Sequence, residues 1–228
     1  MTLTDAEAML PVCGMFFRGD NRPPHEADGP FNIGFSKKDI VSRYAHYRQP
    51  SLNNHLIVPT LFAANPALVV STSRDLKVAA DFPLNGENES WIYVVFIEKG
   101  INVSTHGYQK MDKPHLAARC YNFFYAQEVI TTSIPANHIV AAFKIERNYQ
   151  NLRKDTRQLF GYTERINDGT FKILLVSYHQ EALEFLNKNF PKYLPSVEGL
   201  KNALNKLVNT THRFVQSQDG YKKNQLTN

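Results

Sequence analysis

Three short polar segments of the chain have the residue types and the placement to bind a ligand. Arg18 follows two aromatic residues at the end of a predicted strand, and its planar guanidinium matches a phosphate or diphosphate in a bidentate way. Ser71-Thr72-Ser73 ends another predicted strand and opens a helix. Hydroxyls and backbone N–H groups there suit a ribose or an amide. Glu128 begins an apolar run, where a carboxylate is costly to bury and therefore favours the wall of a cleft.

Each segment also has a purely structural interpretation, which the sequence leaves open. Arg18 could pair with Asp20 or with a loop carbonyl. The Ser-Thr-Ser run could serve only as a helix cap, because hydroxyl side chains are preferred at helix N-termini. Glu128 could cap the edge of its strand.

Alternation, β-branched runs and helical spacing predict the elements that would position these side chains. Asp-Asn followed by Pro-Pro stops the first strand directly after Arg18. Strands are expected over residues 16–19, 66–73, 91–98, 127–133 and 137–146. Helices are expected over residues 37–48, 73–82 and 114–127, with a turn-rich crossing from 24 to 35.

The composition changes after residue 146, which predicts a domain over 1–150 and an extension over 151–228. Asn167-Asp168-Gly169 lies between two apolar-rich runs and predicts a hairpin over 162–178. Two helices are expected to follow. The face of the second is formed by Val197, Leu200, Leu204, Leu207 and Phe214. These helices could pack on the core, dock a target or form a membrane-proximal element, and their ordinary amphipathic faces favour the core.

The composition excludes several classes of protein. A hydrophobic content of 43% favours a packed core over disorder, and no apolar run approaches the length of a membrane span. The net charge of +5 comes from scattered Lys and Arg, without an RNA-binding signature, so we expect no nucleic-acid partner. The dispersed His residues predict no metal site. Whether Cys13 and Cys120 pair is left open.

Taken together and in order, the segments resemble a known enzyme family. FFRGDNRPP at 16–24, STS at 71–73 and QEV at 127–129 with the following I-P-x-x-x-I are similar to the cholera-toxin and pertussis-toxin group of mono-ADP-ribosyltransferases. The resemblance covers residues 16 to about 146. It implies an α+β fold, an ADP-ribosyltransferase-like split β-sandwich with flanking helices, to which the partly helical C-terminal extension is added.

The resemblance implies a role for each matched residue in a site for NAD+, the substrate. Arg18 would hold the diphosphate or the adjoining ribose, with Asp20 fixing the turn and orienting Arg18. Ser71, Thr72 and Ser73 would support the nicotinamide side. Glu128 would be the catalytic residue that stabilises an oxocarbenium-like transition state as nicotinamide leaves. A family His before the Ser-Thr-Ser motif is matched by His55, although a solvent-facing His55, or His46 in its place, stays an alternative.

One departure from the family concerns target recognition. The family usually has Glu or Gln two residues before the catalytic Glu, and this chain has Ala126 there. An arginine target is therefore in doubt, although Gln127 could reach the target instead. Tyr125 lies in the same recognition segment.

The resemblance implies transfer of ADP-ribose from NAD+ to a protein side chain, without a metal. Alternatives are an NAD+ glycohydrolase and an inactive NAD+-binding or host-protein-binding module. It further implies a bacterial toxin or effector whose target is a host protein. The absence of a secretory signal in the first residues then favours secretion or injection into the host cytosol. A host activating protein, which some family members need, is a further expected partner, and a monomer is the default.

Overall fold

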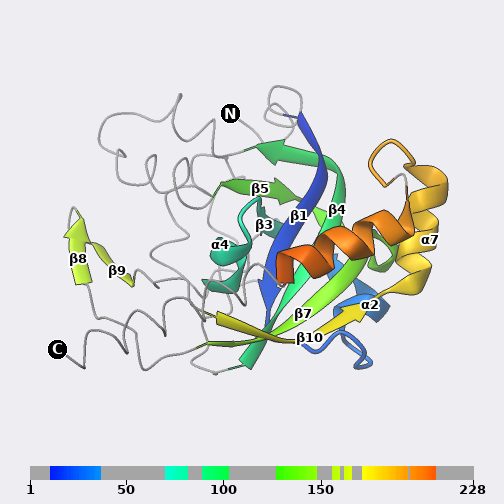
Figure 1. Cartoon of the computed structure of the whole chain (residues 1–228). Helices are drawn as coiled ribbons and strands as arrows, with labels where there is room; N and C mark the ends of the chain where they lie inside the picture. Colours follow the sequence, from blue (N-terminus) through cyan, green and yellow to red (C-terminus); the bar gives the residue numbers. More distant parts are fainter. Residues whose placement is uncertain are drawn as a thin grey trace.

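The computed structural model describes residues 11–36, 70–81, 89–102, 127–147, 156–159, 162–165, 171–194 and 196–208. These residues form three antiparallel sheets with helices beside them, so the α+β class predicted from the sequence is confirmed (Figure 1). The largest sheet has six strands in the order β1-β3-β5-β4-β7-β10. Their bounds are Pro11–Asp20, Val70–Ser73, Glu128–Thr131, Glu89–Asn102, Ile139–Arg147 and Phe171–Tyr178.

Four strands of this sheet form a closed circuit of pairings. β1 pairs with both β3 and β4, and β5 also pairs with both β3 and β4. Phe17 is opposite Ser73, and Ser73 is in turn opposite Glu128. The circuit therefore brings the three polar segments side by side, although they are far apart in the sequence.

Both faces of β4 are covered by other elements. Ile92, Val94 and Phe96 contribute to one hydrophobic cluster, and the alternate residues Tyr93, Val95 and Ile97 contribute to the other. Successive side chains of a strand point to opposite faces of the sheet. This explains why the sequence of β4 is continuously apolar rather than alternating, as predicted for a central strand.

Helices cover the first of these faces. α4 (Leu76–Asp81), α7 (Gln180–Asn189) and a helix over residues 197–208 contribute to the same cluster as Phe96. Leu183, Leu186 and Leu204 are buried there. In Figure 1 the orange helix 197–208 lies across the sheet in front of β1. The C-terminal helices thus share one core with β4, β7 and β10 and with the side chains of β1 on this face.

The second face is covered by short elements. α2 (Pro30–Ile33) contributes Phe31, and β2 (Phe35–Ser36) pairs with β6 (Ser133–Ile134). A single-turn helix η4 (Ala136–His138) then leads into β7. The sequence predicted only a turn-rich crossing where α2 lies; Pro30 at the first helical position suits this short helix.

Two other predictions need correction. β1 begins at Pro11 rather than at residue 16, because an irregular register between Val12 and Gly14 hides the start of the strand in the sequence. The hairpin expected across residues 167–169 is wrong. β9 (Tyr162–Arg165) pairs with β8 (Thr156–Leu159), whereas β10 pairs with β7.

The pairing of β10 with β7 buries Phe171 and Ile173 in the hydrophobic cluster under α7. Burial of two large apolar side chains outweighs a local turn signal. The expected domain boundary near residue 150 lies outside the described residues and stays a prediction, as do the predicted helices over 37–48 and 114–127 apart from Gln127.

Candidate active site

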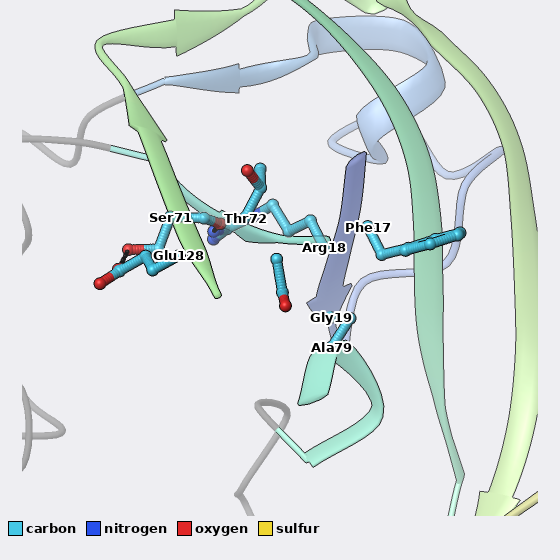
Figure 2. Close-up of a pocket in the computed structure, with 8 residues that line it drawn as sticks. Phe17, Arg18, Gly19, Ser71, Thr72, Ala79 and Glu128 are labelled. Atoms are coloured by element: carbon cyan, nitrogen blue, oxygen red, sulfur yellow. Dashed lines mark hydrogen bonds between the residues drawn. The ribbon is translucent and has the colours of Figure 1, made fainter. Parts of the chain in front are cut away.

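A small cleft lies where β1, β3 and β5 meet α4, and it contains all three polar segments (Figure 2). Its volume is about 120 Å³. The lining residues are Phe17, Arg18, Gly19, Ser71, Thr72, Ser73, Ala79 and Glu128. Ligand pockets for whole small molecules commonly reach about 300 Å³ or more. The described residues therefore enclose part of a nucleotide-sized ligand rather than all of it.

Arg18 extends from β1 across the cleft toward β3, on the side of the strand opposite to Phe17 (Figure 2). Its Nη1 donates a hydrogen bond of 2.7 Å to the carbonyl oxygen of Ser71. Its Nε is buried without a hydrogen-bond partner among the described residues. Burial lowers the pKa of Arg18, which the charge of Asp20 partly offsets, but a guanidinium stays protonated in proteins. Arg18 thus offers a half-buried positive charge whose Nε lacks an acceptor among the described residues, which fits an anionic ligand.

Asp20 lies near Arg18 without a hydrogen bond to it, because the Asp20 carboxylate is paired with Arg22. The Arg18 Nη2 to Asp20 Oδ2 distance is 3.8 Å. Arg22 instead engages both carboxylate oxygens, at 2.9 Å through Nε and 3.1 Å through Nη2, and its backbone N–H donates at 3.0 Å. Burial raises the pKa of Asp20. The hydrogen bonds from Arg22 and the charges of both guanidinium groups lower this pKa by more, so the net shift is downward.

Glu128 is held by a hydroxyl from the neighbouring strand. Ser71 Oγ donates a hydrogen bond of 2.5 Å to Glu128 Oε1, and the Glu128 residue is only 7% exposed. Figure 2 shows the two side chains side by side at the end of the cleft away from β1. Ser71 therefore fixes the Glu128 carboxylate at the wall of the cleft. The carbonyl oxygen of the same serine accepts the hydrogen bond from Arg18.

The other two hydroxyls of the Ser-Thr-Ser run have structural partners. Thr72 Oγ1 donates a buried hydrogen bond of 2.8 Å to the carbonyl oxygen of Val129. Ser73 Oγ accepts from the backbone N–H of Asp75 at 3.0 Å, just before α4. The cap of α4 is Asp75, whose Oδ1 accepts from the backbone N–H of Lys77 at 2.8 Å. Ser73 supports this cap, whereas Ser71 contacts the carboxylate of Glu128.

The residues expected to recognise a target are placed only in part. Gln127 precedes Glu128 with a φ of 44°, in the left-handed region, and its carbonyl oxygen accepts from the Arg74 N–H at 3.3 Å. His55, Tyr125 and Ala126 lie outside the described residues. Sequence reasoning missed the lining residues Phe17, Gly19 and Ala79. The first two are neighbours of Arg18 in the motif, and nothing in the local sequence marks Ala79.

The described residues contain no group of His, Cys, Asp and Glu that could hold a metal ion. None of the helices in this part of the chain is long and apolar enough to cross a membrane. Cys13 has a free, half-buried thiol, and Cys120 lies outside the described residues.

No protein-family model matches the chain, and no curated protein matches it. Among solved structures, the chain is similar to full-length CARDS toxin, with 16% identity, 74% of this chain and 29% of that chain covered, and a TM-score of 0.48. It is similar to Scabin toxin from Streptomyces scabies in complex with NADH, with 19% identity, coverage of 59% and 66%, and a TM-score of 0.39. A guanine-specific ADP-ribosyltransferase has 23% identity, coverage of 58% and 67%, and a TM-score of 0.39.

The chain spans only 29% of full-length CARDS toxin and 66% of the Scabin chain. At these identities and TM-scores the likeness decides neither the family nor the activity of this protein. Both questions therefore depend on the residues of the cleft.

Proposed function

We propose that the protein is a mono-ADP-ribosyltransferase, which transfers ADP-ribose from NAD+ to a protein side chain and releases nicotinamide. The observation that carries the proposal is the convergence of Arg18, Ser71 and Glu128 on one cleft. These residues lie in the motifs that resemble those of the mono-ADP-ribosyltransferases. Arg18 and Ser71 are hydrogen-bonded although they are 53 positions apart in the sequence, and Ser71 and Glu128 are hydrogen-bonded although they are 57 positions apart.

In this proposal Arg18 binds the diphosphate of NAD+. The Ser71 carbonyl oxygen fixes one end of the guanidinium, and the buried Nε lacks an acceptor among the described residues, which a phosphate oxygen would supply. A charge-assisted hydrogen bond to an ionised group is roughly twice as strong as a neutral one. The small volume of the cleft suits one part of the dinucleotide, with the remainder bound beyond the described residues.

Glu128 is the proposed catalytic residue. The glycosidic C–N bond of NAD+ breaks, nicotinamide leaves with the bonding electrons, and positive charge develops on the ribose. A fixed carboxylate stabilises this oxocarbenium-like state more than it stabilises the ground state, which is the condition for catalysis. A nucleophile of the target then bonds to the same carbon and gives up its proton. Ser71 keeps the carboxylate oriented toward the cleft throughout.

The target is proposed to be a host protein, reached by secretion or injection, and a host activating protein is a further proposed partner. Tyr125, Ala126 and Gln127 immediately precede Glu128 and are the proposed contacts to the target. A second candidate function is NAD+ glycohydrolase activity, with water as the acceptor. Ala126 favours it, because alanine cannot hydrogen-bond a target side chain.

The test is incubation of the purified chain with adenylate-labelled NAD+ and a eukaryotic cell lysate. Wild type is compared with Glu128→Gln and with Glu146→Gln, a control for charge removal at an exposed site on β7. We expect label on discrete proteins for wild type and Glu146→Gln, and a loss of about 100-fold or more for Glu128→Gln.

Other outcomes separate the alternatives. Nicotinamide release that depends on Glu128 but leaves no label on protein would indicate the glycohydrolase. A folded wild type that releases no nicotinamide in the presence of lysate would contradict both activities and leave a binding module.

A further inference from the structure

Two arginines of the first motif lie against one buried aromatic ring. The Cζ atom of Arg18 is 4.8 Å from the centroid of the Phe35 ring, and that of Arg22 is 5.3 Å from it. Phe35 itself is 3% exposed. A cation within about 6 Å of the face of an aromatic ring is attracted by the ring quadrupole, most strongly where water is excluded.

We infer that Phe35 is a positioning residue for NAD+ binding, because its ring holds the Arg18 guanidinium in the orientation that receives the diphosphate. This inference rests on the proposed function. Phe35 itself does not line the cleft, so it would act through Arg18.

Arg18 depends on the Phe35 ring because the nearest carboxylate, that of Asp20, is paired with Arg22. Asp20 forms a two-pronged pair with Arg22 and remains 3.8 Å from Arg18. The Ser71 carbonyl oxygen fixes only Nη1. An arginine side chain has several rotatable bonds, and ordering it costs considerable conformational entropy. The Phe35 ring therefore supplies the second restraint on the orientation of the guanidinium.

The ring is itself held from two directions. Phe35 is opposite Ile134 in the β2–β6 pair, so its backbone is fixed by a strand. The ring of Tyr93 meets it in an edge contact with centroids 5.3 Å apart. The Tyr93 hydroxyl donates a hydrogen bond to the carbonyl oxygen of Arg22. Tyr93 therefore restrains both the Phe35 ring and the backbone that follows Arg18.

The test compares Phe35→Leu with Phe35→Tyr and with Phe31→Leu. Phe31 is a matched control because it is 5% exposed and also meets Tyr93 edge-on, at 6.2 Å. No guanidinium in the described part of the chain lies over the Phe31 ring. NAD+ binding is measured through the fluorescence of Trp91, the single tryptophan, which is opposite Asp20 in the β1–β4 pair. The KM for NAD+ and kcat are measured from nicotinamide release, and thermal unfolding reports whether each variant is folded.

We expect Phe35→Leu to weaken NAD+ binding and raise KM roughly 3- to 30-fold, with kcat at saturating NAD+ nearly unchanged. Phe35→Tyr retains the ring face and should retain the wild-type KM. Phe31→Leu should lower thermal stability while leaving KM as in wild type. If Phe35→Leu does not fold, Phe35→Met replaces it in the same comparison.

Equal KM values for folded Phe35→Leu and wild type would overturn the inference, as would equal increases in Phe35→Leu and Phe31→Leu. Both of these results leave the proposed function standing, since the wild type is active. A wild type that neither binds nor cleaves NAD+ would overturn the proposed function, and the inference with it.

Discussion

Ser71 and Glu128 are joined by a hydrogen bond of 2.5 Å between neighbouring strands, although 57 residues separate them in the sequence. The same serine accepts a hydrogen bond from Arg18 through its carbonyl oxygen. One residue of β3 therefore contacts both the guanidinium and the carboxylate. Ser71 thus links the two charged groups, through its backbone on one side and its side chain on the other.

Removal of the Ser71 hydroxyl should impair the reaction more than the fold. In Ser71→Ala the Glu128 carboxylate loses a buried hydrogen-bond donor, and such a loss costs about 1–3 kcal/mol. We expect nicotinamide release to fall roughly 5- to 100-fold in kcat. The measurement is steady-state kinetics with NAD+.

Ser133→Ala serves as the control, because this serine is exposed on β6. An unchanged kcat in a folded Ser71→Ala would show that the hydroxyl does not orient Glu128.

The candidate site could be predicted from the sequence because its residues occur in short motifs at strand ends. The apolar run of β4, the strand that begins at Glu128 and the helix α7 were predicted from the sequence as well, since local patterns specify them. Features set by distant contacts could not be predicted. The contact of the Arg18 and Arg22 guanidinium groups with the Phe35 ring depends on how β2 returns to these arginines. No local pattern encodes that return.

Loss of the Asp20 charge should make the protein less stable at neutral pH. The folded state holds the pKa of Asp20 below its ordinary value, through its hydrogen bonds to Arg22 and the charges of Arg18 and Arg22, against the opposing effect of burial. The carboxylate therefore contributes stability above about pH 4, where it is ionised even in the unfolded chain. That contribution is lost as the pH falls through the lowered pKa of the folded state.

We expect Asp20→Asn to lower the free energy of unfolding by roughly 1–3 kcal/mol at pH 7. The difference from wild type should shrink between about pH 5 and pH 2. Urea unfolding at a series of pH values measures it, with the exposed Glu198→Gln as the control. A difference that is constant over this range would contradict the role assigned to the ionised carboxylate.

The C-terminal helix should contribute directly to the stability of the whole core. Leu204 is 5% exposed and belongs to the same hydrophobic cluster as Ala79 and Phe96. Leu204→Ala should lower the free energy of unfolding by about 2–5 kcal/mol, the usual cost of removing a buried leucine side chain. Asn202→Ala, at an exposed position of the same helix, should have little effect. A helix that only docks a target would give equal values for the two variants in urea unfolding.

Gly34 should be required for the placement of Phe35. Gly34 has a φ of +72°, and a Cβ atom there would lie 2.3 Å from the carbonyl oxygen of Ile134. An L-residue in the left-handed region costs about 1–2 kcal/mol even without a clash. We therefore expect Gly34→Ala to lower the free energy of unfolding by at least about 2 kcal/mol. Because β2 pairs with β6 directly after this residue, the variant should also raise the KM for NAD+ by displacing the ring beneath Arg18.

Gly199→Ala is the matched control for this substitution. In the helix over residues 197–208, a Cβ at Gly199 would meet Ser196 Cβ at 3.4 Å, an ordinary contact. Alanine is favoured over glycine in helices by about 1 kcal/mol, so this variant should be slightly more stable and should keep the wild-type KM. If Gly34→Ala is destabilised while its folded fraction keeps the wild-type KM, the position of Phe35 does not control NAD+ binding. A rise in KM that accompanies the loss of stability, and that is absent from Gly199→Ala, links the backbone at Gly34 to the guanidinium of Arg18.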